Sequence, residues 1–212
     1  MGYGLTIFDY DGVLIDSLQQ VLSVSAEFCH LIGHEPAPTK ETIRKLDVMT
    51  YPELARAAGL SSRRIDAFTR YVFDRFRSAN APVAFFPGIR SLLHQLSPQK
   101  TAIVSGNAKD VISAQLTAHG LAERIGFIYG ALESGDKAKK IKFACLEAGV
   151  NPAMACMVGD AVSDMRCAKQ AGVTAIAVTW GWQPKHILSK ENPDYVVDTV
   201  SELSSLLVEV NR

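Results

Sequence analysis

Residues 7–17 read IFDYDGVLIDS, and this stretch is the most informative part of the chain. The apolar run 5–8 ends at two carboxylates one residue apart, Asp9 and Asp11, followed by Gly12. Residues i and i+2 of a strand point to the same face, so both carboxylates occupy one small volume if the chain turns here. Like charges held close need a cation or a proton between them. The stretch therefore predicts a divalent-metal site, an acid–base pair or both, unless it is an ordinary acidic turn.

Composition favours a globular protein and excludes several other classes. The chain has 212 residues, 48% of them hydrophobic, which suits one large domain or one domain with a smaller insert. Its 22 basic and 22 acidic residues leave a net charge near zero, so no nucleic-acid or anionic-membrane partner is expected. No apolar run approaches the roughly 20 residues of a membrane span, and no signal peptide is visible. We expect a cytoplasmic protein with four buried free thiols: Cys29, Cys145, Cys156 and Cys167.

Short apolar runs alternate with helical patterns along most of the chain. The runs that we predict as strands are 5–8, 101–104, 127–129, 155–158, 174–178 and 195–197. The helical patterns 111–119, 141–148 and 164–171 each end at a glycine, a common helix stop. This alternation predicts an α/β fold, a Rossmann-like parallel sheet with helices on both faces. Sites in such folds form at the carboxyl ends of the strands.

Residues 17–84 interrupt this alternation and contain helical patterns without a convincing strand. The patterns cover 18–32, 39–46, 51–58 and 62–78, with Ser61-Ser62 as the predicted N-cap of the last. Pro82 and Pro87-Gly88 then mark a turn back. We therefore predict a small all-helical cap domain at 17–84, inserted after the first strand of a core domain formed by 1–16 and 85–212.

Two polar clusters follow later strands and admit two interpretations each. Ser105, Gly106 and Asn107 precede a helix beginning near Ala108, where backbone N–H groups bind anions well, although a simple N-cap explains them too. Lys137 precedes the helix 138–148, where a cation is slightly unfavourable against the helix dipole. It either neutralises a phosphate or belongs to a solvated basic face with Lys139, Lys140 and Lys142.

A third cluster, residues 157–164 with the sequence MVGDAVSD, carries two more carboxylates. If Ser163 opens the helix, Asp160 lies at the strand end and Asp164 in the first helical turn. Asp164 also fits a mere preference of carboxylates for helix N-termini. Together with Asp9 and Asp11, however, the cluster favours a metal site, and ligands that are all oxygen suit Mg²⁺.

Four motifs now stand in order: DYDGVLIDS at 9–17, VSGN at 104–107, DK at 136–137 and VGDAVSD at 158–164. Together they resemble the haloacid dehalogenase superfamily of phosphohydrolases. The chain is most similar to the subfamily with a helical cap after the first motif, which includes phosphoglycolate phosphatases and beta-phosphoglucomutases. Each motif alone is weak, but their order and spacing are specific, and the resemblance covers nearly the whole chain.

The resemblance implies roles for these residues. Asp9 matches the nucleophile that forms an aspartyl phosphate, and Asp11 the general acid that protonates the leaving oxygen and then activates water. The phosphoryl group would be bound by Ser105, Gly106, Asn107 and Lys137. The resemblance further implies Mg²⁺ as cofactor, bound by Asp9, the backbone carbonyl of Asp11 and Asp160, with Asp164 acting through water or orienting ligands.

The chain departs from the family pattern at three places. Val13 stands where phosphatases of this group often have Thr, although valine is found in the mutase-like branch. The lysine motif lacks its usual Lys-Pro-x-Pro form, so that Lys139 competes with Lys137 for the role. In the cap, Asp47 replaces a frequent glycine, and Arg44 is our candidate for reaching the substrate.

From this resemblance we predict a Mg²⁺-dependent phosphatase of a small phosphomonoester, with 2-phosphoglycolate as the named candidate, acting as a monomer or homodimer. The first alternative is a phosphosugar mutase of the beta-phosphoglucomutase type. The second is a non-catalytic binding module on the same fold, which has no need for Asp9, Asp11, Ser105, Lys137 and Asp160 together.

Overall fold

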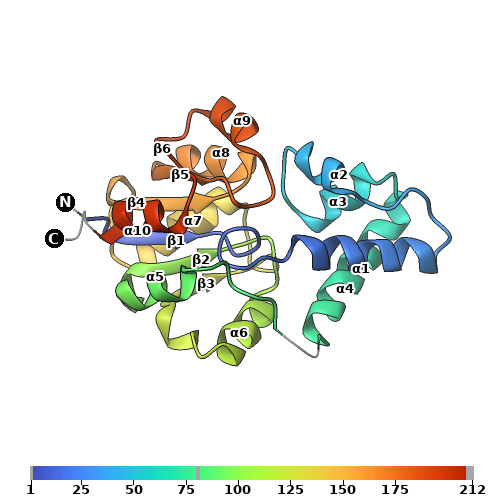
Figure 1. Cartoon of the computed structure of the whole chain (residues 1–212), viewed down its shortest axis with the longest axis horizontal. Coiled ribbons are helices and arrows are strands. Elements are labelled where there is room, and N and C mark those ends of the chain that lie inside the picture. Colours follow the sequence, from blue (N-terminus) through green and yellow to red (C-terminus); the bar gives the residue numbers. More distant parts are fainter. Residues whose placement is uncertain (1, 80–81, 209–212) are drawn as a thin grey trace.

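A six-stranded sheet in the order β3-β2-β1-β4-β5-β6 forms the centre of the larger part of the molecule (Figure 1). The computed structural model describes residues 2–79 and 82–208. All neighbouring strands pair in parallel, which confirms the predicted α/β fold. The strands are β1 (Leu5–Phe8), β2 (Thr101–Val104), β3 (Phe127–Tyr129), β4 (Ala155–Gly159), β5 (Thr174–Val178) and β6 (Tyr195–Val197).

Helices cover both faces of this sheet. Leu5 and Ile7 pack with the helices of one face, whereas Phe8 packs with those of the other, as the strand alternation requires. The first face carries α7 (Lys137–Glu147), α8 (Val162–Ala171) and the short α9 (Lys185–Leu188); the second carries α5 (Ile89–Gln95), α6 (Lys109–Ala118) and α10 (Val200–Val208). Burial on both sides explains why the strands are nearly continuous apolar runs.

The strand order reverses between β1 and β4, and this reversal positions the site. From β1 the chain moves outward to β2 and β3, then crosses back to β4 on the other side of β1. In such sheets a crevice opens beyond the carboxyl ends of the two strands at the reversal. Asp9 follows β1 and Asp160 follows β4, so both lie at this crevice.

The first four helices after β1 form a separate group beside the sheet (Figure 1). They are α1 (Leu18–Leu31), α2 (Lys40–Arg44), α3 (Tyr51–Ala57) and α4 (Ser62–Arg77). The two segments that connect the group to the core lie antiparallel, because Asp16 N donates to Ala84 O at 2.9 Å and Phe86 N donates to Leu14 O at 3.0 Å. We call the group the cap and keep 17–84 as its proposed extent.

The cap has its own aromatic interior. Phe28 of α1 meets Phe68 of α4 edge to face with ring centroids 5.4 Å apart. Tyr51 at the start of α3 meets Phe73 of α4 in the same manner at 5.2 Å. Edge-to-face contacts of this kind stabilise beyond their buried area, and they join α1, α3 and α4 into one unit.

Several helix ends differ from the sequence prediction for local reasons. Helix α2 stops at Arg44 instead of residue 46, and the Gln183 side chain binds the carbonyls of Arg44 and Leu46. Ser61 occupies the N-cap position of α4 but makes no capping hydrogen bond through its side chain. Helix α8 begins at Val162, so the premise that Ser163 opens it is wrong by one residue.

The cysteines agree with the prediction except in one detail. All four thiols are free; three are buried, whereas Cys167 is half-buried. Among the helices of residues 2–79 and 82–208, none combines the length and the apolar character of a membrane span.

Candidate active site

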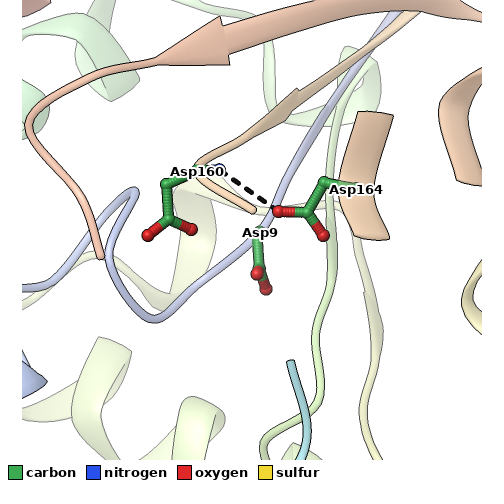
Figure 2. Close-up of side chains that lie close together, drawn as sticks. All are labelled: Asp9, Asp160 and Asp164. Carbon is green, nitrogen blue, oxygen red and sulfur yellow. Dashed lines mark hydrogen bonds between the residues drawn. The ribbon is translucent and has the colours of Figure 1, made fainter. Parts of the chain in front are cut away.

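Three buried carboxylates converge at the carboxyl ends of β1 and β4. Asp9, Asp160 and Asp164 each offer an oxygen, and these oxygens all lie within 4.8 Å of one another. Figure 2 shows Asp9 between the other two, with Asp160 at the strand end and Asp164 on the first turn of α8. The convergence brings the first and fourth sequence motifs, about 150 residues apart in the chain, into one cluster.

Backbone amides of the surrounding loops hold the three side chains in place. Tyr10 N donates to Asp9 Oδ1 at 2.7 Å, and Trp182 N donates to Asp160 Oδ2 at 2.6 Å. Asp164 Oδ2 accepts from the amides of Asp160 and Ala161 at 3.2 and 3.1 Å, so this carboxylate caps its own helix while it orients the loop before it.

Two glycines allow the chain to pass close to Asp160. Gly12 has φ +79°, and a Cβ there would lie 2.1 Å from Asp160 Oδ2. A Cβ at Gly181 would lie 2.3 Å from the same oxygen. The loops after β1 and β5 can therefore enclose this carboxylate only because both positions lack a side chain.

Lys137 is the cation of the cluster. Its Nζ lies 3.0 Å from Asp9 Oδ2 and donates to Asp164 Oδ1 at 2.6 Å. Burial lowers the pKa of Lys137, but the Asp164 and Asp9 carboxylates outweigh burial and raise this pKa above its ordinary value. Lys139 is exposed and only its backbone N–H contacts the Asp136 cap, so the geometry distinguishes the two lysines.

One ammonium faces three carboxylates, which leaves the cluster short of positive charge. Burial raises the pKa of Asp160 well above its usual range, and Asp164 and Asp9 raise it further. Burial also raises the pKa of Asp164 to about 6, although Lys137 opposes the shift. Buried like charges are costly unless paired, and these donors are all oxygen, so the cluster fits a hard divalent cation.

Asp11 points to a different set of partners and is separate from the cluster. Its Oδ1 accepts from Ser17 Oγ at 2.6 Å and its Oδ2 from Asn107 Nδ2 at 2.9 Å. Burial raises the pKa of Asp11 to about 6, and the nearby Asp9 adds to the rise, while the hydrogen bonds from Ser17 and Asn107 oppose it. A carboxyl group tuned in this direction suits proton transfer near neutral pH.

The Ser105–Asn107 loop adjoins the same carboxylates. Ser105 Oγ accepts from Asn107 N at 3.2 Å, and Asn107 Oδ1 accepts from Ala108 N at 2.8 Å. Helix α6 has Ala108 at its N-cap position and no capping hydrogen bond from a side chain, so the simple N-cap interpretation of Ser105 and Asn107 is wrong. Asn107 Nδ2 instead donates to Asp11. Ser105 and Gly106 line a small cavity together with Asp9 and Asp11, where the resemblance expects the phosphoryl group.

The cap closes this cavity with residues that the sequence did not single out. Met49, Thr50, Tyr51 and Leu54 line it from the cap side, and Trp182 lines it from the loop after β5. Arg44, our cap candidate, is not among the lining residues; its side chain is half-exposed, 3.8 Å from Glu41. The sequence did not reveal these cap residues. Thr50-Tyr51-Pro52 marks the start of a helix, but it does not indicate which side of that helix faces the core.

Comparisons with known proteins agree with this arrangement. The chain is 28% identical over 208 residues to a phosphoglycolate phosphatase of Synechococcus elongatus, covering 97% of this chain and 98% of that protein. It is 26% identical over 214 residues to a phosphoglycolate phosphatase of Vibrio parahaemolyticus, covering 94% and 93%. A haloacid dehalogenase-like hydrolase from Streptococcus pneumoniae has a similar fold, with a TM-score of 0.82 at 24% identity over 94% of this chain and 97% of that one.

A match to a whole protein family covers most of the chain. The sequence model of the haloacid dehalogenase-like hydrolases matches residues 6–178. This span contains all four motifs and every residue of the acidic cluster, from Asp9 to Asp164. The recognition made from the motifs is thereby confirmed: the chain is an enzyme that belongs to the haloacid dehalogenase-like hydrolase family.

Proposed function

We propose that this hydrolase is a Mg²⁺-dependent phosphatase that cleaves a small phosphomonoester through an aspartyl phosphate on Asp9. The observation that carries the proposal is the convergence of Asp9, Asp160 and Asp164 around Lys137, with Asp11 beside them on a separate hydrogen-bond set.

The unpaired thiols support a cytoplasmic location.

The residues support two chemical steps. First, the Asp9 carboxylate attacks phosphorus, the bond to the ester oxygen breaks, and Asp11 gives its proton to that leaving oxygen. Second, Asp11, now a carboxylate, takes a proton from a water molecule that attacks the same phosphorus. The bond to Asp9 then breaks and inorganic phosphate leaves, which restores both side chains.

The phosphoryl oxygens would be held by groups already in position. Ser105 Oγ and the Lys137 ammonium offer a hydroxyl and a positive charge. Asp9, Asp160 and the carbonyl of Asp11 would hold Mg²⁺, and Asp164 would orient the loop through its two amide hydrogen bonds. When bound, the cation supplies positive charge opposite the phosphoryl oxygens.

Relatives supply the first substrate to test. Because the Synechococcus and Vibrio proteins are named phosphoglycolate phosphatases, 2-phosphoglycolate is the substrate that we carry forward as a candidate.

Replacing the nucleophile gives a direct test. Asp9→Asn should abolish release of p-nitrophenol from p-nitrophenyl phosphate with Mg²⁺ while leaving the circular dichroism spectrum unchanged. Asp16→Asn, an exposed carboxylate seven residues along the chain, is the matched control and should keep full activity. Wild-type protein quenched during turnover should carry one added phosphoryl group by mass spectrometry.

Two results would contradict this assignment. Full activity of Asp9→Asn would exclude the covalent mechanism. Isomerisation of a sugar phosphate without release of free phosphate would identify the mutase instead.

A further inference from the structure

Two buried hydrogen-bond donors at the site have no partner. They are the Tyr51 hydroxyl and the Trp182 indole N–H, and neither contacts an acceptor within residues 2–79 and 82–208. Both side chains belong to residues that are more than nine-tenths buried, at 6% and 8% exposure. Native proteins pair nearly all of their buried polar atoms, so each of these donors requires an explanation.

The two residues that carry these donors line the small cavity that also contains Asp9, Asp11 and Ser105. Tyr51 comes from the cap, at the first residue of α3, whereas Trp182 comes from the core, in the loop after β5. Two independent segments therefore bring an unpaired donor to the place where a phosphoester would react. A ligand that accepts from both would also bridge the cap and the core.

Each donor is held firmly enough to act as a recognition group. The Tyr51 ring packs on Phe73, and the Trp182 backbone is fixed by Asp160. Burial raises the pKa of Tyr51 well above its ordinary value, and Asp11 and Asp9 raise it further, so the phenol keeps its proton. The indole nitrogen can only donate. The cavity thus presents two neutral donors.

The phosphoryl group does not need these donors. Ser105 lies in the same cavity, and the Lys137 ammonium reaches the proposed nucleophile at 3.0 Å. With the proposed cation, these groups serve the phosphoryl oxygens. The donors of Tyr51 and Trp182 remain for the oxygens of the leaving group.

A larger cavity of about 590 Å³ lies between the cap and the core and shares Tyr51, Ser105 and Gly106 with the small cavity. The basic side chains that line it are already paired with groups of the protein. Lys137 pairs with Asp9 and Asp164, and Lys140 Nζ donates to Gly130 O at 2.6 Å. Lys137 therefore serves the reacting end of the substrate and Lys140 a backbone carbonyl, so neither ammonium is left for the leaving group.

The third lining cation, Arg166, has a half-exposed side chain and is also paired. It contacts Asp47 at 3.3 Å and Glu191 at 2.8 Å. Asp47 and Asp136 line the cavity as well, so they add negative charge to it. A second carboxylate on the substrate would meet repulsion and, within the described lining, no unpaired cation.

We propose that Tyr51 and Trp182 recognise oxygen acceptors on an uncharged leaving group, so that hydroxylated alkyl phosphates are preferred over phosphorylated carboxylic acids. This inference rests on the phosphatase activity proposed above. It differs from the expectation taken from the relatives' names, because 2-phosphoglycolate carries a carboxylate on its leaving group.

A pair of substrates with the same two-carbon skeleton tests the preference. The full chain with Mg²⁺ is assayed for phosphate release from 2-hydroxyethyl phosphate and from 2-phosphoglycolate. We expect kcat/KM to be roughly tenfold or more higher for the hydroxyethyl ester, since the carboxylate has no unpaired cation to meet. Equal or faster hydrolysis of 2-phosphoglycolate would overturn the inference.

Conservative variants then test the two residues. Tyr51→Phe keeps the ring on Phe73 and should lower kcat/KM for 2-hydroxyethyl phosphate roughly 3- to 15-fold. The same variant should lower kcat/KM for ethyl phosphate, which lacks the terminal hydroxyl, by a clearly smaller factor. Trp182→Phe should behave alike, and Tyr71→Phe, on the same cap against Phe28, is the matched control without effect.

The outcomes separate this inference from the proposed function. An equal loss on ethyl phosphate, or no loss on the hydroxylated ester, would overturn the recognition role while p-nitrophenyl phosphate is still hydrolysed through Asp9. Absence of phosphate release from every ester, p-nitrophenyl phosphate included, would overturn the phosphatase activity itself.

Discussion

At the scale of single residues, Asp160 shows how burial and charge combine at the site. It is 2% exposed, lies among other carboxylates and has only the Trp182 amide as a side-chain hydrogen-bond partner within the described residues. Burial raises its pKa, and Asp164 and Asp9 raise it further. Without a bound cation, an ionised carboxylate in this position destabilises the fold, and a bound cation would offset that cost.

This arrangement predicts how stability depends on pH. The folded-state pKa of Asp160 lies above its unfolded value. Its contribution to the free energy of unfolding is therefore fully present below about pH 4 and is lost as the pH rises through the folded-state pKa. Asp164, with a folded-state pKa of about 6, has the same sign. Metal-free protein should therefore melt at a higher temperature near pH 5 than near pH 8, and Mg²⁺ should restore the loss at pH 8.

A variant isolates the residue responsible. Asp160→Asn should raise the free energy of unfolding of metal-free protein at pH 8, because it removes a buried like charge, and it should remove the stabilisation by Mg²⁺. Differential scanning calorimetry measures both effects, with Asp16→Asn as the unaffected control. A melting temperature of the metal-free wild type that increases from pH 5 to pH 8 would contradict the argument.

At the scale of elements, the site depends on three loops after β1, β4 and β5 that approach one another closely. Gly12 and Gly181 bring the first and the third of these loops against Asp160. The Trp182 backbone N–H of the third loop donates to Asp160 Oδ2 at 2.6 Å, so backbone geometry helps to set the position of the carboxylate. Small displacements there can change the rate strongly, because reacting groups must meet within a fraction of an ångström.

Adding one methyl group at this contact should affect both activity and stability. Gly181→Ala places a Cβ 2.3 Å from Asp160 and should lower kcat about 100-fold, and the overpacking should lower the melting temperature as well. Gly33→Ala is the contrasting control: its φ is +64° and nothing lies within 4 Å of the added Cβ, so it should lower stability and keep kcat. If Gly181→Ala kept the wild-type kcat, the close approach of residue 181 to Asp160 would not be needed for activity.

At the scale of the whole molecule, the cap and the core are joined by buried polar contacts beside the site. Gln183 of the core is 1% exposed, and its Nε2 donates to the cap carbonyls of Arg44 and Leu46 at 3.2 and 2.9 Å. Its Oε1 accepts from Val162 N at 2.7 Å, at the start of α8. One side chain therefore joins the end of α2 in the cap to the helix that carries Asp164.

Removing this link should loosen the cap without touching the reacting groups. Gln183→Leu leaves two carbonyls and one amide unpaired and should lower the free energy of unfolding by about 1–3 kcal/mol. It should also speed amide hydrogen exchange around residues 44–50 and raise KM more than it lowers kcat. The exposed Gln99→Leu should change none of these. Unchanged exchange around residues 44–50 would show that other contacts hold the cap.

Much of the fold was predictable because its signals are local. The apolar runs that became β1 to β6 were visible in the sequence, since a strand buried on both faces reads as a continuous apolar run. Helix ends were predicted less well. The stop of α2 coincides with contacts made by Gln183, nearly 140 residues away, which no local pattern reveals.

The sequence by itself determined the parallel α/β fold, the helical insertion and the acidic residues of the site, because strand ends, glycines and carboxylates leave marks along the chain. Only the tertiary structure decided how these residues meet. It selected Lys137 over Lys139 at the carboxylates, left Arg44 paired with Glu41, and placed Tyr51 and Trp182 unpaired at the cavity. The reason is physical: burial, pairing and the choice among neighbouring side chains depend on elements that are distant in sequence and that only the packed molecule brings together.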